Sequence, residues 1–212
     1  METATHTAHE PGDGSLTVEL QHTQLGPTPD GSAAWPLFDY DDVVQWALGF
    51  GAIDERDAGR LRRQARRDPD GARAVFERTL RIRATLDDIF RAIATGGRPS
   101  AEATARLASD EAEAVGRARL VPDGDRFAWS WADDDSLARP LWPVVHDATR
   151  LLIEGPLDRI KACDGCRYLF IDESKNRSRR WCDMSTCGTA EKMRRYVARR
   201  AAKRGTAATA EG

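Results

Sequence analysis

The sequence lacks cysteine over its first 162 residues, and its four cysteines all fall between positions 163 and 187. It also lacks any apolar run near the roughly 18 residues that a membrane-spanning helix needs. Its first residues show neither the basic region nor the apolar core of a secretory signal. We therefore expect a cytoplasmic protein without a membrane partner. In the cytoplasm, disulfides rarely persist. Cysteines gathered at short spacings then favour metal binding.

The motifs of common enzyme classes are also missing. The sequence contains no HExxH metal site, no phosphate-binding P-loop and no Gly-x-Ser-x-Gly nucleophile elbow. His22 and His146 are isolated in the sequence. A lone histidine is more often a surface residue or a satisfied core residue than a catalytic one. The sequence therefore predicts that the protein is not an enzyme.

Charge is divided unevenly along the chain. Residues 161–204 contain 13 basic and 5 acidic residues, a net charge of +8, whereas residues 1–160 carry a net charge of −9. A basic end of this kind indicates an anionic partner, and nucleic acid is the usual one. For the arginine-rich segment alone, a solvated surface or a surface that docks on the acidic body is an equally weighted alternative.

Hydrophobic periodicity predicts a mainly α-helical fold with small β-hairpins. The expected helices, with helical apolar spacing and Gly or Pro at their ends, cover residues 40–49, 54–67, 72–94, 100–115 and 137–153. Residues 16–25 are a strand or a short helix, and residues 117–131 alternate around a Pro-Asp-Gly turn, which predicts a hairpin.

Gly155-Pro156 marks the expected boundary between two parts of the chain. A helical N-terminal domain covers residues 16–155, and a small C-terminal module covers residues 156–204. Residues 1–15 and 205–212 contain almost no large apolar residues, so we expect both ends to be disordered.

Most of the tryptophans fall in the helical domain. Large aromatic side chains mainly drive burial, so we interpret these tryptophans as core residues or pocket walls rather than nucleic-acid stackers. If the domain contains a ligand pocket, the residues expected to line it are Trp35, Trp46, Trp129 and Trp142.

The four cysteines follow the spacing C-x2-C-x15-C-x4-C, at Cys163, Cys166, Cys182 and Cys187. Zinc prefers four tetrahedral ligands, and four thiolates leave no open position for catalysis. The spacing therefore predicts one structural Zn²⁺ ion. An iron–sulfur cluster and a redox pair of thiols are the less favoured alternatives.

Basic residues lie between and after the cysteine pairs. Residues 168–171 alternate in polarity and predict a strand, and residues 172–180 form a charged turn. A helix is expected from residue 189 to about 203, with a basic stripe on one side. A short helix anchored by a metal site is a common way to reach the DNA major groove. The candidate nucleic-acid contacts are Lys175, Asn176, Arg177, Ser178, Arg179, Arg180, Lys192, Arg195 and Arg199.

The run from Cys163 to Gly188 resembles the CGNR zinc finger family. Besides the cysteines, the positions that match the family pattern are Phe170, Asp172, Ser174, Asn176, Ser178, Arg179, Arg180, Trp181, Met184 and Gly188. Upstream, LTVELQHT, DYDDVVQWALGFGAID and an arginine-rich helix resemble the ABATE domain that usually precedes this finger. The resemblance implies a bacterial, stress-related transcription regulator whose finger binds DNA and whose N-terminal domain senses a ligand or a partner.

One position departs from the family pattern. The final Asn-Arg of the motif is Thr189-Ala190 in this chain. An arginine is therefore missing from the first turn of the expected helix, and we expect weaker or differently specific DNA contacts.

Two functions remain open from the sequence. The first is a zinc-dependent DNA-binding regulator. The second is a non-enzymatic ligand- or protein-binding protein whose finger is purely structural. Pairing of Arg179 and Arg180 with carboxylates of residues 1–155 would favour the second. Regulators often dimerise to bind paired half-sites, although the sequence shows no dimer face.

Overall fold

The computed structural model describes residues 15–23, 36–131, 135–166 and 168–208, with the backbone alone for residues 201–208. Trp35 and most of the two chain ends lie outside the described residues. The expectations for them stay predictions.

The described part of the chain contains seven α-helices, six of which the sequence predicts; residues 16–25, left open as a strand or a short helix, form the seventh. They are α1 (Leu16–Gln21), α2 (Tyr40–Gly49), α3 (Glu55–Arg67), α4 (Pro69–Ala94), α5 (Ala101–Gly116), α6 (Leu141–Glu154) and α7 (Thr189–Ala208). Four of them begin at a polar N-cap whose side chain accepts a backbone N–H one turn later, and these caps are Asp39, Asp54, Asp68 and Ser100. Local sequence therefore fixes where these helices begin.

Three helix boundaries differ from the sequence prediction by three residues or more. Helix α4 begins at Pro69 rather than at residue 72, because Asp68 caps it and proline is tolerated in the first turn of a helix. Helix α6 begins at Leu141 rather than at residue 137, with Pro140 as its N-cap. The residue before a proline is driven out of the helical region, which explains the later start. Helix α7 continues to Ala208, into the tail predicted to be disordered. At the other end, Ser15 is buried and donates a 2.8 Å hydrogen bond to Asp147.

Two antiparallel hairpins complete the fold. The predicted hairpin consists of β1 (Ala118–Asp123) and β2 (Arg126–Trp131), and Gly124 takes a positive φ of 60° in its turn. The second hairpin consists of β3 (Ile160–Ala162) and β4 (Leu169–Ile171). Strand β4 lies where the sequence predicts a strand. The sequence analysis missed β3, because three residues carry too little periodicity to stand out.

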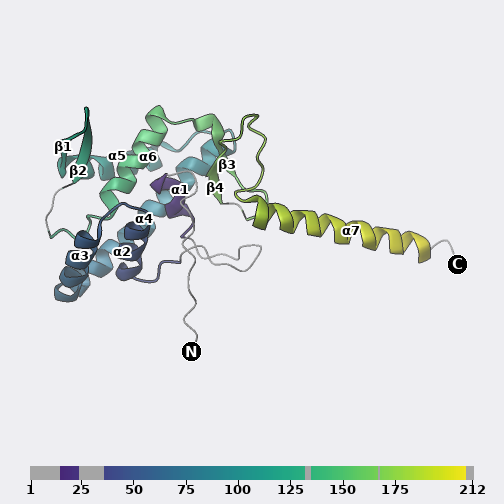
Figure 1. The fold of residues 1–212 in the computed structure, drawn as a ribbon, viewed down its shortest axis with the longest axis horizontal. Helices are drawn as coiled ribbons and strands as arrows, with labels where there is room; N and C mark the ends of the chain where they lie inside the picture. Colours follow the sequence, from purple (N-terminus) through teal and green to yellow (C-terminus); the bar gives the residue numbers. More distant parts are fainter. Residues whose placement is uncertain (1–14, 24–35, 132–134, 167, 209–212) are drawn as a thin grey trace.

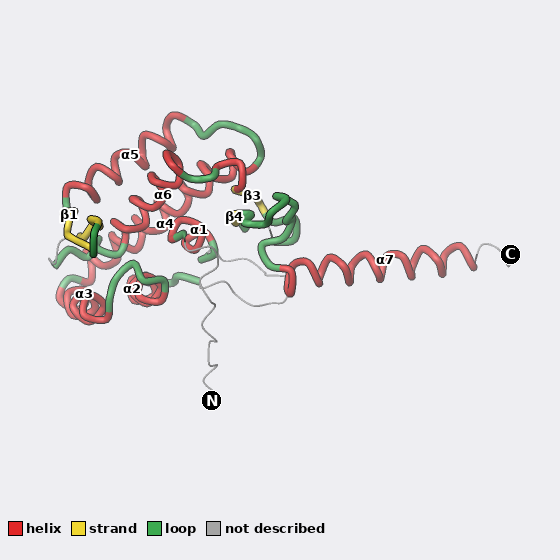
Figure 2. The backbone as a smooth tube through the Cα atoms, turned by 45° about the horizontal axis from the view of Figure 1, so that its top comes forward, coloured by secondary structure: helices red, strands yellow, loops and turns green. Residues whose placement is uncertain are grey.

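Helices α1 to α6 form one body, and α7 projects away from it (Figure 1). Figure 2 shows the β1–β2 hairpin at the end of the body opposite α7, with β3 and β4 beside the start of α7. The second hairpin is therefore the part of the chain that joins the C-terminal helix to the body.

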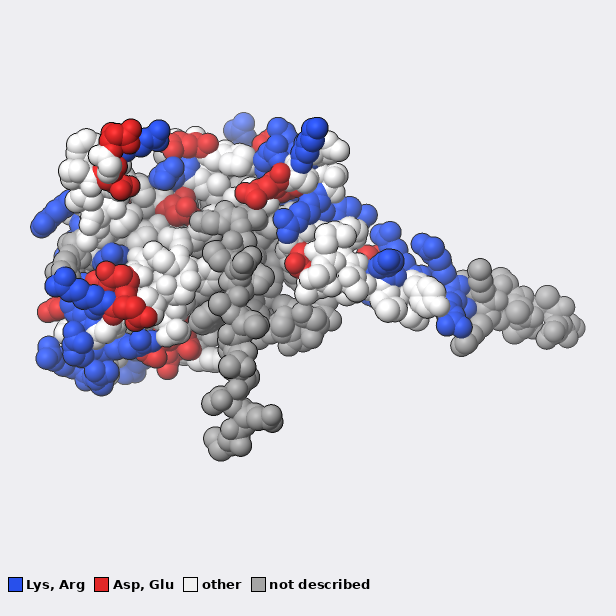
Figure 3. All heavy atoms as spheres, in the orientation of Figure 1, with Lys and Arg blue, Asp and Glu red and all other residues white. Residues whose placement is uncertain are grey.

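The surface of the body is not uniformly acidic. Figure 3 shows basic and acidic side chains interspersed over the body, with basic side chains gathered at α3 and along the described part of α7. Helix α3 alone carries Arg56, Arg60, Arg62, Arg63, Arg66 and Arg67. On the face that Figure 3 shows, the net negative charge of the first 160 residues therefore does not produce a continuous acidic surface.

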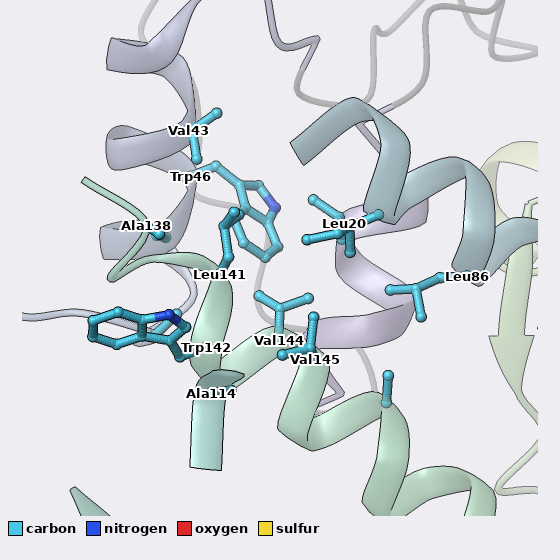
Figure 4. Packing of buried hydrophobic residues seen from close by; sticks show 14 of the residues in the cluster. Leu20, Val43, Trp46, Leu86, Ala114, Ala138, Leu141, Trp142, Val144 and Val145 are labelled. Atoms are coloured by element: carbon cyan, nitrogen blue, oxygen red, sulfur yellow. The ribbon is translucent and has the colours of Figure 1, made fainter. Parts of the chain in front are cut away.

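Trp46 and Trp142 fill the core of the body. Each is 1% exposed, and their neighbours in the core include Leu20, Leu141 and Val144 (Figure 4). Trp46 belongs to the apolar core, and Arg117 lies over the Trp142 ring with its guanidinium carbon 5.9 Å from the ring centroid. Trp129, on β2, is 39% exposed.

The β3–β4 hairpin has two apolar faces that serve different parts of the molecule. Ile160, Leu169 and Ile171 belong to the core of the body, whereas Phe170 packs with Cys163 on the other face. Neighbouring residues of a strand point to opposite faces, so one short hairpin can join two cores. The C-terminal module is therefore built onto the body.

Candidate metal centre and nucleic-acid interface

The first cysteine pair lies in a tight turn that follows β3. The backbone N–H of Cys163 donates to the carbonyl of Tyr168 at 2.7 Å, and the N–H of Gly165 approaches the sulfur of Cys163 at 3.3 Å. A Cβ on Gly165 would lie only 3.1 Å from the Cβ of Cys187. Glycine at this position therefore lets the two cysteine pairs approach each other.

The second pair spans a wide helical turn, η2 (Met184–Gly188), that leads directly into α7. Asp183 begins this turn and accepts hydrogen bonds from the N–H of Thr186 at 2.7 Å and from the hydroxyl of Ser185 at 2.6 Å. Cys187 lies within the turn and is buried. A metal bound to Cys187 would therefore fix the start of α7.

The four sulfur atoms form one compact cluster. All lie within 4.8 Å of one another, and the sulfur of Cys182 lies 3.5 Å from that of Cys166 and 3.7 Å from that of Cys187. A tetrahedral zinc site with Zn–S bonds of about 2.3 Å places its sulfurs about 3.8 Å apart. A disulfide would need about 2.05 Å. The four cysteines therefore fit a single tetrahedral metal ion.

The thiols of this cluster influence one another strongly. The hydrogen bond with Cys163, together with burial, raises the pKa of Cys166 to about 12. Hydrogen bonds from Cys166 and Cys182 hold the pKa of Cys163 far below its usual range. Four adjacent thiolates would repel each other, and the positive charge of a bound divalent cation offsets that repulsion and keeps its thiol ligands deprotonated. The electrostatics therefore favour a metal-bound cluster.

Asp172 organises the loop that joins the two cysteine pairs. Its carboxylate is fully buried and accepts hydrogen bonds from Lys161 Nζ at 2.5 Å, from the hydroxyl of Ser174 at 2.6 Å and from the N–H of Arg179 at 3.0 Å. Burial alone raises the pKa of Asp172, but these hydrogen bonds outweigh it and hold the pKa well below the usual range. The sequence analysis matched Asp172 to the family pattern without assigning this role, and it missed Lys161.

We expect Asp172→Asn to lower the thermal stability of the module at pH 7. An amide nitrogen cannot accept the bonds from Lys161 and Arg179, so buried donors lose their acceptor. Because the pKa of Asp172 is lowered in the fold, its stabilisation is complete above the ordinary carboxyl pKa of about 4 and is lost as the pH falls below it. Thermal unfolding measures the effect, and Glu173→Gln, an exposed neighbour, is the control. Equal melting temperatures for the two variants would contradict this role.

Three of the predicted DNA-contacting arginines are bonded within the module. Arg177 pairs with Asp158, and Arg180 pairs with Asp164 at 2.7 Å. Arg179 lies over the ring of Phe170 and donates to the carbonyls of Trp181 and Cys182. Within the described chain, none of these three arginines bonds to a carboxylate of residues 1–155. The basic module is therefore not docked on the body through these arginines.

The remaining predicted contacts face solvent. Lys175, Asn176 and Ser178 are exposed on the loop, and Lys192, Arg195 and Arg199 are exposed on α7. Arg195 donates to Glu191 at 2.7 Å. Within the described residues, the side chains of Lys192 and Arg199 have no partner. The predicted set therefore contains three arginines bonded within the finger and six residues exposed to solvent. Among the exposed residues, Lys192 and Arg199 are cations without a partner in the described chain.

Two models of known protein families match this chain. A family model described as "ABATE: Putative stress-induced transcription regulator" matches residues 14–155, about two thirds of the chain. The chain belongs to the ABATE family. A second family model, the CGNR zinc finger, matches residues 159–200. Both resemblances drawn from the sequence are thereby confirmed, in the predicted order. A search of curated proteins gave no match.

The departure from the CGNR pattern lies at the first turn of α7. Thr189 begins the helix and donates its hydroxyl to the carbonyl of Met184 at 3.2 Å, while Ala190 is half-buried. The missing arginine therefore does not disturb the cysteine cluster. Without this arginine, the first basic residue on α7 is Lys192.

The ABATE domain contacts the CGNR finger through α1. His22 Nε2 lies 3.0 Å from the carbonyl of Leu169 on β4, and the His22 ring stacks on Tyr168 with ring centroids 5.0 Å apart. The other histidine considered from the sequence, His146, lies 2.7 Å from Glu111. Both histidines therefore have structural partners. Neither contact could be predicted from the sequence, because the two partners of each contact lie far apart along the chain.

The ABATE domain carries a groove of about 730 Å³ between α2, α3 and α4. Phe38, Ala65 and Phe76 are among its apolar lining residues, and Arg62 and Arg66 lie at its edge. Trp46, Trp129 and Trp142, the described members of the predicted pocket, are absent from its lining. No described helix is both long and apolar enough to cross a membrane, and neither family is a family of enzymes.

Proposed function

We propose that this protein is a bacterial, cytoplasmic, stress-responsive transcription regulator that binds DNA through a zinc-dependent finger. The observation that carries this proposal is the side of α7 formed by Lys192, Arg195 and Arg199. These cations are exposed, and the helix that holds them begins two residues after Cys187. Phosphate contacts from lysine and arginine supply most of the affinity of such interfaces.

We propose zinc as the metal. Tetrahedral coordination by four thiolates suits zinc or iron. The sulfur separations of 3.5 and 3.7 Å suit a single ion, since the cysteines of an iron–sulfur cluster bind separate iron atoms. Four thiolates leave no open coordination position, so the ion has a structural role and supplies no catalytic chemistry.

The ABATE domain has the features of a sensor. Its groove of about 730 Å³ lies within the size range of small-molecule sites. Its helices α1 and α4 contact the β3–β4 hairpin that carries the finger. A ligand or partner bound to this domain would therefore act on the finger through packed elements. We propose no enzymatic activity, because the described residues offer no nucleophile–base pair beside the groove.

Binding to mixed-sequence duplex DNA tests the proposal. With zinc content confirmed, we expect fluorescence anisotropy to show binding at low salt that weakens steeply as salt rises, because each neutralised phosphate releases counterions. Removal of the metal with a chelator should abolish this binding, since α7 loses its anchor. Absence of binding at low salt by the zinc-loaded protein would overturn the proposal.

One observation favours the alternative of a purely structural finger. Arg177, Arg179 and Arg180 are already bonded within the module, and the β3–β4 hairpin shares the core of the body. A ligand- or protein-binding protein would show this same integration. The same titration separates the two functions, because a structural finger predicts no salt-dependent DNA binding.

A further inference from the structure

A groove of about 380 Å³ lies at the base of α7. The finger forms one wall and the first turns of the helix form the other. The residues that line it are Trp181, Met184, Gly188, Glu191, Lys192, Arg195, Tyr196 and Arg199. The groove contains the free cations of α7 together with three large side chains, Trp181, Met184 and Tyr196, that the predicted nucleic-acid contacts did not include.

Met184 and Tyr196 are largely open to solvent, while Arg200 lies over one face of the Tyr196 ring, with its guanidinium carbon 5.7 Å from the ring centroid. Met184 is 59% exposed and Tyr196 is 55% exposed, while Trp181 is half-buried between them and the metal cluster. Exposed apolar surface in a hollow rimmed by polar residues is typical of binding sites. Aromatic rings in such a setting stack on nucleobases, because every base has a π-face.

The charges that line the groove are mostly positive. Lys192, Arg195 and Arg199 face a single carboxylate, Glu191, which also accepts hydrogen bonds from Arg194 at 2.8 Å. All three cations are exposed, so they remain accessible to a ligand in the groove. The excess positive charge in the groove favours a ligand that carries phosphate.

The helix places the stacking residue between the two free cations. Residues 192, 196 and 199 are separated by four and three positions, so they share one side of α7. At a rise of 1.5 Å per residue, Lys192 and Arg199 lie about 10 Å apart along the axis, with Tyr196 between them. This order of cation, ring and cation matches a base flanked by phosphates.

We propose that this groove binds an unpaired nucleotide, with its base against Tyr196 and Met184 and its phosphates on Lys192 and Arg199. Duplex binding by the finger does not require such a site, so the inference goes beyond the proposed function. The nucleotide can come from a single strand or from a free nucleotide, and the recognised chemistry is the same.

The substitution Tyr196→Ser in the zinc-loaded full chain tests this site. We expect it to weaken binding of a single-stranded oligothymidylate about tenfold, the effect of losing one stacked base, and to change duplex binding less than twofold. Tyr196→Phe should retain binding. Val197→Ser is the matched control, because Val197 is 58% exposed on α7 but does not line the groove.

Competition with free thymidine 3′,5′-bisphosphate, a single nucleotide that carries both flanking phosphates, identifies the source of the nucleotide. Displacement of the oligonucleotide at equal nucleotide concentration supports the site with a free nucleotide as ligand, and no displacement supports the site with a strand as ligand. Equal effects of Tyr196→Ser and Val197→Ser would overturn the inference. Duplex binding without single-strand binding would also overturn it and leave the proposed function standing.

Discussion

Replacing Cys182 by serine should remove the bound metal and release α7 while the helical body stays folded. The sulfur of Cys182 lies 3.5 Å from that of Cys166 and 3.7 Å from that of Cys187. Structural zinc sites contribute roughly 10–16 kcal/mol in isolated zinc-finger peptides, so losing one thiolate is a severe change. We expect elemental analysis to give one zinc ion per wild-type chain and almost none in the variant.

The architecture sets a limit on this effect. Ile160, Leu169 and Ile171 belong to the core of the body and not to the cluster. The β3–β4 hairpin should therefore persist, and limited tryptic digestion should cut at the arginines and lysines of residues 175–204 before it cuts the body. Treatment of the wild type with a chelator should give the same pattern.

The control for this experiment is Met184→Ser. Met184 lies between the second pair of cysteines, is exposed and offers no thiolate. It should keep its zinc and its resistance to trypsin. Retention of one zinc ion per chain by Cys182→Ser would contradict the four-thiolate site, and iron in the wild type would contradict the choice of metal.

Replacing Lys192 and Arg199 together by alanine should weaken duplex DNA binding at least tenfold at moderate salt. Both side chains are exposed and lack partners within the described chain, so their removal leaves no buried group unsatisfied and should not affect folding. Each phosphate contact contributes about 0.9 to the slope of log affinity against log salt concentration. The double variant should lower the slope by about 2, measured by anisotropy titrations at several salt concentrations.

A variant with the same charge loss on the body separates local contact from net charge. Arg63→Ala with Arg66→Ala removes two cations from α3, where basic side chains also gather (Figure 3). We expect this pair to change neither affinity nor slope by more than a small amount. Equal losses in the two double variants would show that the DNA interface is not confined to α7.

The sequence by itself determined the cysteine cluster and most of the helices. Four cysteines at C-x2-C-x15-C-x4-C spacing, with Gly165 in the first turn, can meet at one point because each pair closes a local turn. The caps Asp39, Asp54 and Asp68 act on backbone groups three residues away. Such features depend on neighbours along the chain, so they can be predicted from a single sequence.

Only the tertiary structure decided which polar groups are free and which are used. Arg179 and Arg199 look equivalent in the sequence, yet one donates to backbone carbonyls inside the finger and the other faces solvent. The sequence left Trp46 as either a core residue or a pocket wall, and in the structure it fills the core. His22 reaches β4 across 147 positions of sequence. A side chain finds its partner by distance in space, and periodicity and spacing along one chain do not contain that distance.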